Sequence, residues 1–191
     1  PFKQPFMVDA LKRVRELDID LICPGHGPVL DSHIPELMAI YDAWCEMPTN
    51  EKTTVVIPYV SAYGYTEQLA EEITKGIKEA GDIDVKSYDL VTADAGVVAG
   101  EIGAADGILF GTPTILQGAL KPIWDLTTGM YAPIHGGKLA SAFGSYGWSG
   151  EAPKMLTEAL VDMKVEVVTE PVKSYFNPQE EDLAAARALG V

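Results

Sequence analysis

The chain has 191 residues, 47% of them apolar, and its 28 acidic and 14 basic residues give a net charge of −14. This length accommodates one full domain and roughly fifty further residues, while the charge argues against nucleic acid and membranes as partners, because polyanions and anionic lipid surfaces attract basic patches. The two cysteines form no CxxC pair or disulfide framework, and no signal peptide or membrane-length apolar run is present, so we expect a cytoplasmic protein with reduced thiols.

The first fifty residues predict a helix, a short strand, a turn and a second helix. Apolar residues recur at helical spacing from Met7 to Leu17, and the stretch LDIDLIC, residues 17–23, is typical of a strand. The turn-rich PGHGP, residues 24–28, leads to a helix predicted at 35–47. These elements are too few for a two-layer core, and the chain begins with proline rather than methionine. We therefore expect a processed, cloned or incomplete product in which they end a larger domain.

After a polar linker at 48–54, apolar strands alternate with amphipathic helices. Strands are predicted at 54–60, 83–88, 107–111, 138–143 and 165–170, and helices near 66–80, 94–104, 118–129, 150–162 and 179–189. This alternation predicts a doubly wound α/β domain, with a mostly parallel five-stranded sheet and helices on both faces. Ligands bind such folds at the carboxyl ends of the strands, near the topological switch point.

The loop after the first strand of this domain, SAYGYT, has the features of an anion site without a cation. The following helix directs unpaired N–H groups and the positive end of its dipole at the loop. No Walker A lysine or GxGxxG motif is present, which argues against nucleotide triphosphate hydrolysis and Rossmann-type NAD binding. A phosphate monoester such as that of FMN fits, and the alternative is an ordinary helix cap and turn. The predicted phosphate-binding residues are Ser61, Ala62, Tyr63, Gly64, Tyr65 and Thr66.

Two further loops follow strands at the same edge of the predicted sheet. Large aromatic side chains on a glycine-rich loop favour a flat ligand, with Tyr146 and Trp148 as candidates for ring contacts, although ordinary loop packing is the alternative. The predicted cofactor-binding residues are Thr112, Pro113, Thr114, Ile115, Leu116 and Gln117 in one loop and Ser145, Tyr146, Gly147, Trp148, Ser149 and Gly150 in the other.

These three loops resemble the FMN-binding loops of flavodoxins. Tyr63 and Tyr65 depart from short-chain flavodoxins, which usually carry Ser or Thr at the first position and often Asn at the second. Together with SYGWSGEA, they make residues 51–191 more similar to the flavodoxin domain of flavodiiron proteins (A-type flavoproteins). The resemblance implies a flavodoxin-like sheet with strand order 2-1-3-4-5 and FMN as the cofactor.

The segment LICPGHGPVL resembles the end of the metallo-β-lactamase-like diiron domain that precedes the flavodoxin domain in this family. The resemblance makes residues 1–50 the remnant of that domain with a linker helix, and His26 a single iron ligand of the full-length parent. The family's His-x-Glu-x-Asp-His cluster is absent, and we interpret His33 and His135 as non-ligands. We therefore expect diiron only in the parent and no O2 or NO reduction by this chain alone.

The function implied by the resemblance is electron transfer. In the parent, a donor such as rubredoxin or a reductase would reduce FMN, which would pass electrons to a diiron site that reduces O2 to water or NO to N2O. A head-to-tail homodimer is also implied. No Ser/His/Asp arrangement or activated cysteine predicts catalytic residues. Three alternatives remain: a free-standing NAD(P)H:quinone or flavin reductase, a flavin-free assembly module, and a metallo-β-lactamase-fold hydrolase, which the missing ligands disfavour.

Overall fold

The computed structural model describes residues 6–46 and 51–191, and the chain divides into two compact units at residues 49 and 50. The first unit contains two helices that pack together, α1 (Phe6–Arg15) and α2 (Ile34–Cys45). An ion pair between Arg15 and Asp42 joins them. Part of the predicted linker at 48–54 lies outside the described residues.

The strand predicted at 17–23 is wrong, because this stretch forms only an isolated antiparallel bridge. Ile22 N–H donates to the carbonyl of Leu30 at 2.9 Å, and Leu30 N–H donates back at 3.0 Å. Pro24 and Pro28 have no N–H to extend the pairing. A backbone with one partner residue cannot form a ladder, so the apolar residues of this stretch remain in a loop.

The second unit is built on a parallel sheet in the order β2-β1-β3-β4-β5, which confirms the predicted fold class and strand order. The strands are β1 (Thr54–Tyr59), β2 (Asp84–Asp89), β3 (Gly107–Gly111), β4 (Leu139–Tyr146), β5 (Glu166–Val167) and β6 (Val172–Tyr175). The first three lie close to their predicted bounds, whereas β4 extends three residues beyond the predicted 143 and includes Ser145 and Tyr146, which were predicted in a loop. The residues of β1, β3 and β4 are mostly apolar and mostly buried, as expected for strands covered on both faces.

The last predicted strand, 165–170, is reduced to the two residues of β5, and β6 is an additional strand that the sequence pattern did not predict. β5 pairs with the start of β4 at Leu139 and Ala140, and β6 pairs with its end, from Phe143 to Tyr146. Pro171 lies between β5 and β6 and cannot donate a ladder hydrogen bond to β4. The sheet therefore has six strands rather than five, with β5 and β6 both paired to β4.

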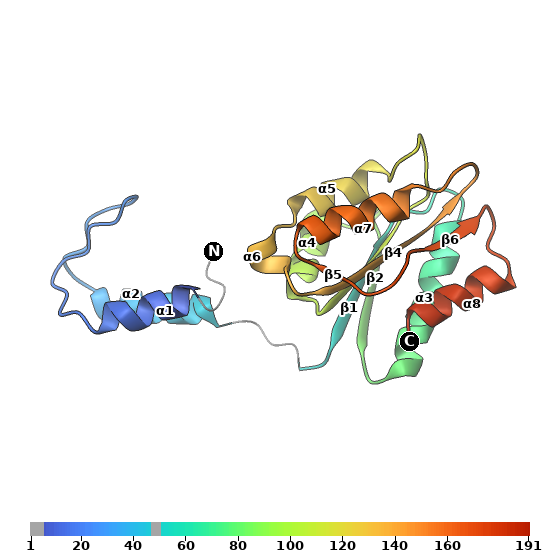
Figure 1. Ribbon diagram of the computed structural model, residues 1–191. Coiled ribbons are helices and arrows are strands. Elements are labelled where there is room, and N and C mark those ends of the chain that lie inside the picture. Colours follow the sequence, from blue (N-terminus) through green and yellow to red (C-terminus); the bar gives the residue numbers. More distant parts are fainter. Residues whose placement is uncertain (1–5, 47–50) are drawn as a thin grey trace. The chain divides into compact units, whose positions relative to one another are not determined.

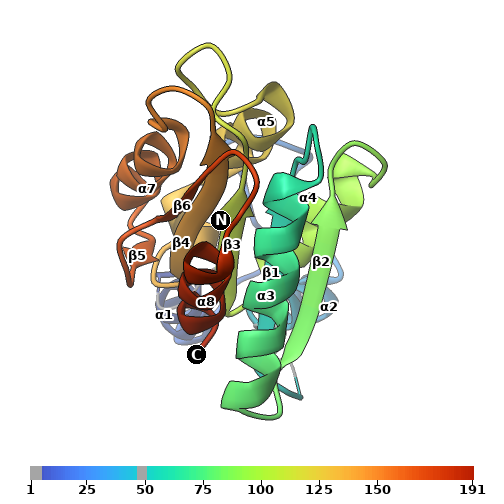
Figure 2. The ribbon, with the colours of Figure 1, turned by 90° about the vertical axis from the view of Figure 1, so that its right-hand side faces the viewer.

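Helices cover both faces of the sheet (Figures 1 and 2). The helices of one face are α3 (Tyr65–Ala80) and α8 (Glu180–Leu189), and those of the other are α4 (Ala95–Ala104), α5 (Lys121–Gly129) and α7 (Ala152–Asp162). A short helix, α6 (Ala132–His135), was not predicted. Helix α5 begins three residues later than the predicted 118, because backbone hydrogen bonds between Ile115 and Gly118 hold that segment in a turn.

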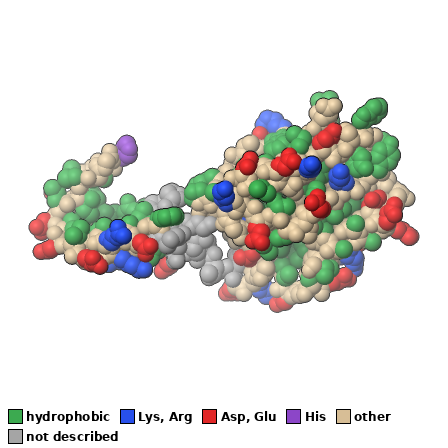
Figure 3. Space-filling view, viewed as in Figure 1, with side chains coloured by type: hydrophobic (Ala, Val, Ile, Leu, Met, Phe, Trp, Pro, Cys, Tyr) green, Lys and Arg blue, Asp and Glu red, His purple; other side chains and the backbone are tan. Residues whose placement is uncertain are grey.

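Two hydrophobic cores follow from the alternation of side chains along the strands. Val56, Ile108 and Phe110 face α4, α5 and α7, whereas Ile57 and Leu109 face α3 and α8. In the described ranges, no helix combines the length and the apolar character needed to cross a membrane. On the face of the second unit shown in Figure 3, Lys and Arg side chains are interspersed with acidic ones.

Candidate functional site

The parallel register brings the three predicted loops to one edge of the sheet. Tyr59, near the end of β1, is paired with Gly111 at the end of β3, and Gly111 is paired with Phe143 in β4. The chain leaves all three strands in the same direction, so the segments after Tyr59, Gly111 and Tyr146 lie at the carboxyl edge. This is the edge at which doubly wound folds bind their ligands.

The first loop turns sharply into α3 at Gly64, which precedes the helix with φ 82°. Ser61 Oγ accepts a hydrogen bond from Glu67 N–H at 3.2 Å and thus takes up one of the free donors of the first helical turn. A Cβ atom added to Gly64 would meet no atom within 4 Å, so this side of the loop is open. Ala62 is exposed as well, and the exposed fraction of Tyr63 is 80%.

The loop is joined to β4 by two buried hydroxyl groups. Thr66 Oγ1 lies 3.0 Å from Ser145 Oγ, and both side chains are buried. These two predicted site residues therefore fix the first and third loops to each other. The open face of the loop is provided instead by its backbone around Gly64, with Tyr65 beside it and the Tyr63 and Tyr65 rings 6.1 Å apart.

The second loop is held by buried threonine contacts. Thr112 is fully buried, and its Oγ1 donates to the Pro113 carbonyl at 3.0 Å and accepts from Leu120 N–H at 3.1 Å. Thr114 N–H donates to the Ser145 carbonyl at 2.8 Å, and its Oγ1 accepts from Ala152 N–H at 3.3 Å. Thr112 and Pro113 thus hold the buried base of the second loop, and Thr114 connects this loop to the third loop.

The tip of the second loop is a tight turn that contains two non-glycine residues with left-handed backbone conformations. Ile115 and Gly118 exchange backbone hydrogen bonds at 3.1 and 3.2 Å. Between them, Leu116 has φ 52° and Gln117 has φ 63°, as in a type I′ turn, which ordinarily favours Gly, Asn or Asp. The turn projects Leu116 almost entirely into solvent, with an exposed fraction of 98%. An unfavourable backbone that displays an apolar side chain is typical of a binding loop.

The third loop is shaped by aromatic packing around its glycines. The Tyr146 ring lies edge-on to the Tyr175 ring at 5.6 Å. Gly150, with φ 65°, packs so closely on Tyr146 that an added Cβ would lie 2.9 Å from the ring, and Gly147 is similarly close to Phe176. Tyr146 is therefore used to pack the loop, whereas Trp148 is 93% exposed and available to cover a ligand.

A pocket of about 250 Å³ lies between the second and third loops. It is lined by Thr114, Leu116, Gln117, Trp148 and Ser149, all of which were predicted as cofactor-binding residues. Apolar walls combined with a few hydroxyl and amide groups are typical of small-molecule sites. The residues of the first loop do not line this pocket, but they lie at the same edge of the sheet and are tied to it through Thr66.

A fourth segment, missed by the sequence analysis, supports the other three. Phe176 N–H donates to the Tyr146 carbonyl at 2.8 Å, and Gln68 Nε2 at the start of α3 donates to Asn177 Oδ1 at 3.3 Å. The segment follows β6, which the sequence pattern did not reveal. The adjacent aromatic residues Tyr175 and Phe176 in a turn were the available signal.

The surroundings of the first loop are acidic. The pKa of Tyr59 is raised to about 12, mainly by burial and additionally by the negative charges of Glu67 and Asp89. At the third loop, Lys173 Nζ lies 5.9 Å from the centre of the Tyr146 ring. The residues from Ser61 to Thr66 include no cation, so an anion bound there would depend on backbone N–H groups and hydroxyls.

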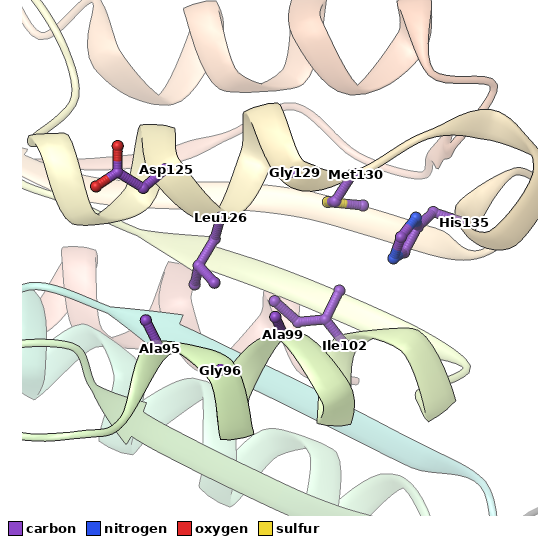
Figure 4. A pocket seen from close by; sticks show the side chains of 9 residues that line it. All are labelled: Ala95, Gly96, Ala99, Ile102, Asp125, Leu126, Gly129, Met130 and His135. Carbon is purple, nitrogen blue, oxygen red and sulfur yellow. The ribbon is translucent and has the colours of Figure 1, made fainter.

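A second cavity, of about 300 Å³, lies between α4 and α5 (Figure 4). It is lined by Ala95, Gly96, Ala99, Ile102, Asp125, Leu126, Gly129, Met130 and His135. The Asp125 carboxylate receives Lys121 Nζ at 2.7 Å. Small and apolar side chains dominate the lining, so this cavity offers few groups that would orient a polar ligand.

The predicted iron ligand, His26, lies in the exposed turn between Ile22 and Leu30. His33 is 3.4 Å from Glu36 through Nδ1, and His135 is buried in α6. In the part of the chain that the structure describes, no three His, Cys, Asp or Glu side chains are grouped so that they could hold a metal ion.

Comparison with known proteins assigns the chain to a family. The flavodoxin family profile matches residues 57–190, and the chain belongs to the flavodoxin family. Two relatives match the whole chain and not only this domain. The chain is 35% identical to a type A flavoprotein of Rhodobacter capsulatus and 38% identical to a flavo-diiron protein of Clostridium acetobutylicum. It covers 44% and 48% of these proteins, so it spans about half the length of the curated relatives it matches.

Solved structures agree with this assignment. A flavodiiron core from Synechocystis is 30% identical, with a TM-score of 0.68 over 96% of this chain and 45% of the other. Rubredoxin oxygen:oxidoreductase from Desulfovibrio gigas is 25% identical, with a TM-score of 0.75 over 96% of this chain and 46% of the other. The resemblance to flavodiiron proteins is thus confirmed. It implies a flavin cofactor, and the relative from Desulfovibrio gigas is consistent with a redox partner.

Proposed function

We propose that this chain binds FMN at the carboxyl edge of its sheet and serves as an electron-transfer domain. The observation that carries the proposal is that three loops, after β1, β3 and β4, lie at one edge of the sheet, where α3 begins with a lysine-free loop. The backbone from Ser61 to Thr66 would hold the phosphate. The loops 112–117 and 145–150 would hold the isoalloxazine ring, with Leu116 and Trp148 as its apolar walls.

Two features at this edge support the binding of FMN. Gly64 leaves open space next to the first turn of α3, where backbone N–H groups and the helix dipole favour a phosphate. Thr114, Gln117 and Ser149 give the pocket of about 250 Å³ groups that can hydrogen-bond a ring edge. When bound, FMN supplies one- and two-electron redox chemistry. The chain binds and orients it, and Leu116 and Trp148 restrict the access of water.

The finer function rests on the flavodiiron resemblance. We propose that a donor such as rubredoxin reduces the flavin, and that electrons pass to a diiron site of a longer protein that reduces O2 to water or NO to N2O. In that protein, residues 1–50 would end a metallo-β-lactamase-like domain, His26 would ligate iron, and two copies would associate head to tail. Support comes from the name of the Desulfovibrio gigas relative and from the flavodiiron cores that match both units of the chain.

The first test is the visible absorption spectrum of the purified chain, with chromatography of the flavin released on denaturation. We expect FMN at about one per chain, either bound on purification or after reconstitution. A colourless protein that ignores added FMN would overturn the proposal and favour the assembly module. Rapid NAD(P)H-dependent quinone reduction by the isolated chain would instead favour a free-standing reductase.

The phosphate site is tested separately by comparing FMN with riboflavin. Riboflavin lacks the phosphate, so we expect it to bind at least about tenfold more weakly, which corresponds to roughly 1.4 kcal/mol. Ser61→Ala should weaken FMN binding and leave riboflavin binding unchanged. Ser87→Ala, on the exposed side of β2, is the matched control and should change neither. Equal affinities for the two flavins would show that the first loop does not hold the phosphate.

A further inference from the structure

The side chain of Gln68, at the start of α3, holds the carbonyl group of Gly64. Its Nε2 donates one hydrogen bond to Gly64 O and one to Asn177 Oδ1, each at 3.3 Å. Gly64 O also accepts from the backbone N–H of Gln68 at 3.1 Å. Both partners of Nε2 are acceptors, so the two N–H bonds of this amide are used in full. Gln68 thus joins the first loop to the segment that precedes α8.

The hydrogen bond to Gly64 fixes a donor as well as an acceptor. A trans peptide is planar, so the carbonyl of Gly64 and the N–H of Tyr65 point in opposite directions. Because the carbonyl is drawn along α3, the N–H of Tyr65 is directed out of the amino terminus of the helix, where the phosphate of FMN is proposed to lie. Gly64 has φ 82°, and a glycine backbone rotates more freely than that of other residues. The second donor from Gln68 therefore restrains a peptide that could otherwise turn easily.

Asn177 is itself held in place on both sides. Phe176 N–H donates to the Tyr146 carbonyl at 2.8 Å, and Nε2 of Gln179, the N-cap residue of α8, donates to the Asn177 carbonyl at 2.8 Å. Phe176 has φ 54°, a conformation that is rare for a bulky side chain and persists only where the surrounding structure imposes it. The carboxamide of Asn177 is thus presented to Gln68 from a fixed backbone.

We propose that Gln68 and Asn177 are positioning residues of the phosphate site, an inference that rests on the proposed binding of FMN. Gln68 acts on the N–H of Tyr65 through the Gly64 carbonyl, and Asn177 acts through Gln68. Because the residues from Ser61 to Thr66 include no cation, binding of a phosphate depends on the directions of such backbone donors. The two side chains thereby favour flavins that carry a phosphate over flavins that lack one.

The test compares the dissociation constants of FMN and riboflavin for the full chain and its variants, with binding followed by the quenching of flavin fluorescence. Gln68→Met keeps the length of the side chain but has no N–H to donate. We expect it to weaken FMN binding about three- to tenfold, as the loss of a hydrogen bond does, and to leave riboflavin binding within about twofold of the wild type. Lys78→Gln, exposed in the last turn of α3, is the control and should keep the full preference for FMN.

Asn177→Ala is a second variant that keeps the inference open to contradiction if Gln68→Met does not fold, because the Asn177 side chain is exposed. It should weaken FMN binding in the same direction and by a smaller factor. The double variant should bind FMN no more weakly than Gln68→Met alone, since both side chains act through one contact. Additive losses would show that Asn177 does not act through Gln68.

A spectroscopic readout reports on the donor itself. In the NMR spectrum of the 15N-labelled chain, FMN should move the Tyr65 amide proton downfield, and it should move it less in Gln68→Met. If the folded variants keep the wild-type ratio of FMN to riboflavin affinity, the inference is wrong while the proposed function stands. If the wild type binds no flavin, or binds FMN and riboflavin equally, the proposed phosphate site itself fails.

Discussion

Thr66 Oγ1 and Ser145 Oγ lie 3.0 Å apart in the interior of the flavodoxin domain, where they join the first turn of α3 to the last residues of β4. The two residues are 79 positions apart in the sequence, and they lie where two loops proposed to hold different parts of FMN meet α3 and β4. Because both hydroxyls are buried, the spacing between the start of α3 and the end of β4 depends on this contact.

Removing one of the two hydroxyls should destabilise the domain. In Ser145→Ala or Thr66→Val, the remaining hydroxyl is buried without its partner, which costs about 1–3 kcal/mol. In the double variant neither hydroxyl remains, so its loss should be clearly smaller than the sum of the two single losses. Urea unfolding of the four proteins measures this coupling. Strictly additive losses would show that the contact contributes nothing to the free energy of unfolding.

Gly144 in β4 has no room for a side chain. A Cβ atom at this position would lie 1.9 Å from the backbone carbonyl oxygen of Thr112. Gly144→Ala should therefore push β4 away from the second loop and lower the free energy of unfolding by about 1–3 kcal/mol. It should also weaken flavin binding, because Thr112 supports that loop. Denaturant unfolding and flavin titration of the same variant test both effects.

Gly100 provides the opposite case. It is exposed in the middle of α4, and an added Cβ would meet no atom within 4 Å. Gly100→Ala should stabilise the domain by about 0.5–1 kcal/mol, because alanine loses less backbone entropy than glycine when a helix forms. Flavin binding should not change. A loss of stability would indicate that this surface of α4 is covered.

Stability at alkaline pH should depend on Tyr59. Its pKa is about 12 in the folded protein against an ordinary value of 10, first because the phenol is buried. Between these values the unfolded chain has lost this proton while the folded chain retains it. The contribution of Tyr59 is therefore complete below pH 10 and declines as the pH rises toward 12. In Tyr59→Phe, the free energy of unfolding should fall less steeply above pH 10. If the free energy of unfolding depended on pH in the same way in the two proteins, Tyr59 would not be the source of the alkaline loss of stability.

At acidic pH the link between α3 and α8 should weaken. Arg187 Nε donates to Glu79 at 3.0 Å and Nη1 to Glu72 at 2.8 Å. The guanidinium lowers the pKa of Glu79 below its ordinary value of 4.5, so the contact stabilises the fold above about pH 4.5 and is lost as the pH falls through the lower folded-state pKa. Arg187→Gln should lower the melting temperature at pH 7 and much less at pH 3. Lys78→Gln, exposed on α3, is the control.

The fold was largely predictable because its main signals are local. Strand residues such as Val56 and Ile108 lie in short apolar runs, and the helices between them carry clear apolar stripes. The additional strand β6 was not predictable, because it depends on which residues of β4 remain available to Val172 and on the missing N–H of Pro171. Conversely, residues 17–23 have the sequence pattern of a strand but pair with a single residue. The pattern of apolar residues in a segment does not show whether a partner strand is present elsewhere in the fold.

The site was predictable as three loops but not in the roles of individual residues. Thr66 and Ser145 carry hydroxyl groups of the kind that often bind ligands, yet both side chains are buried and contact each other. Leu116, an ordinary loop residue in the sequence, is the most exposed wall of the pocket because its turn places it in the left-handed region.

The two borders of the sheet make the domain resistant to aggregation through strand addition. β2 forms one border and carries the charged residues Asp84, Lys86 and Asp89. At the other, β5 has two residues and β6 has four, with Pro171 between them. Charges, prolines and short strands all prevent the strand of another molecule from adding to a sheet. Because Pro171 and the short strands β5 and β6 block strand addition, the domain can expose the partly apolar loops at the carboxyl edge of its sheet without forming sheet contacts with other copies of itself.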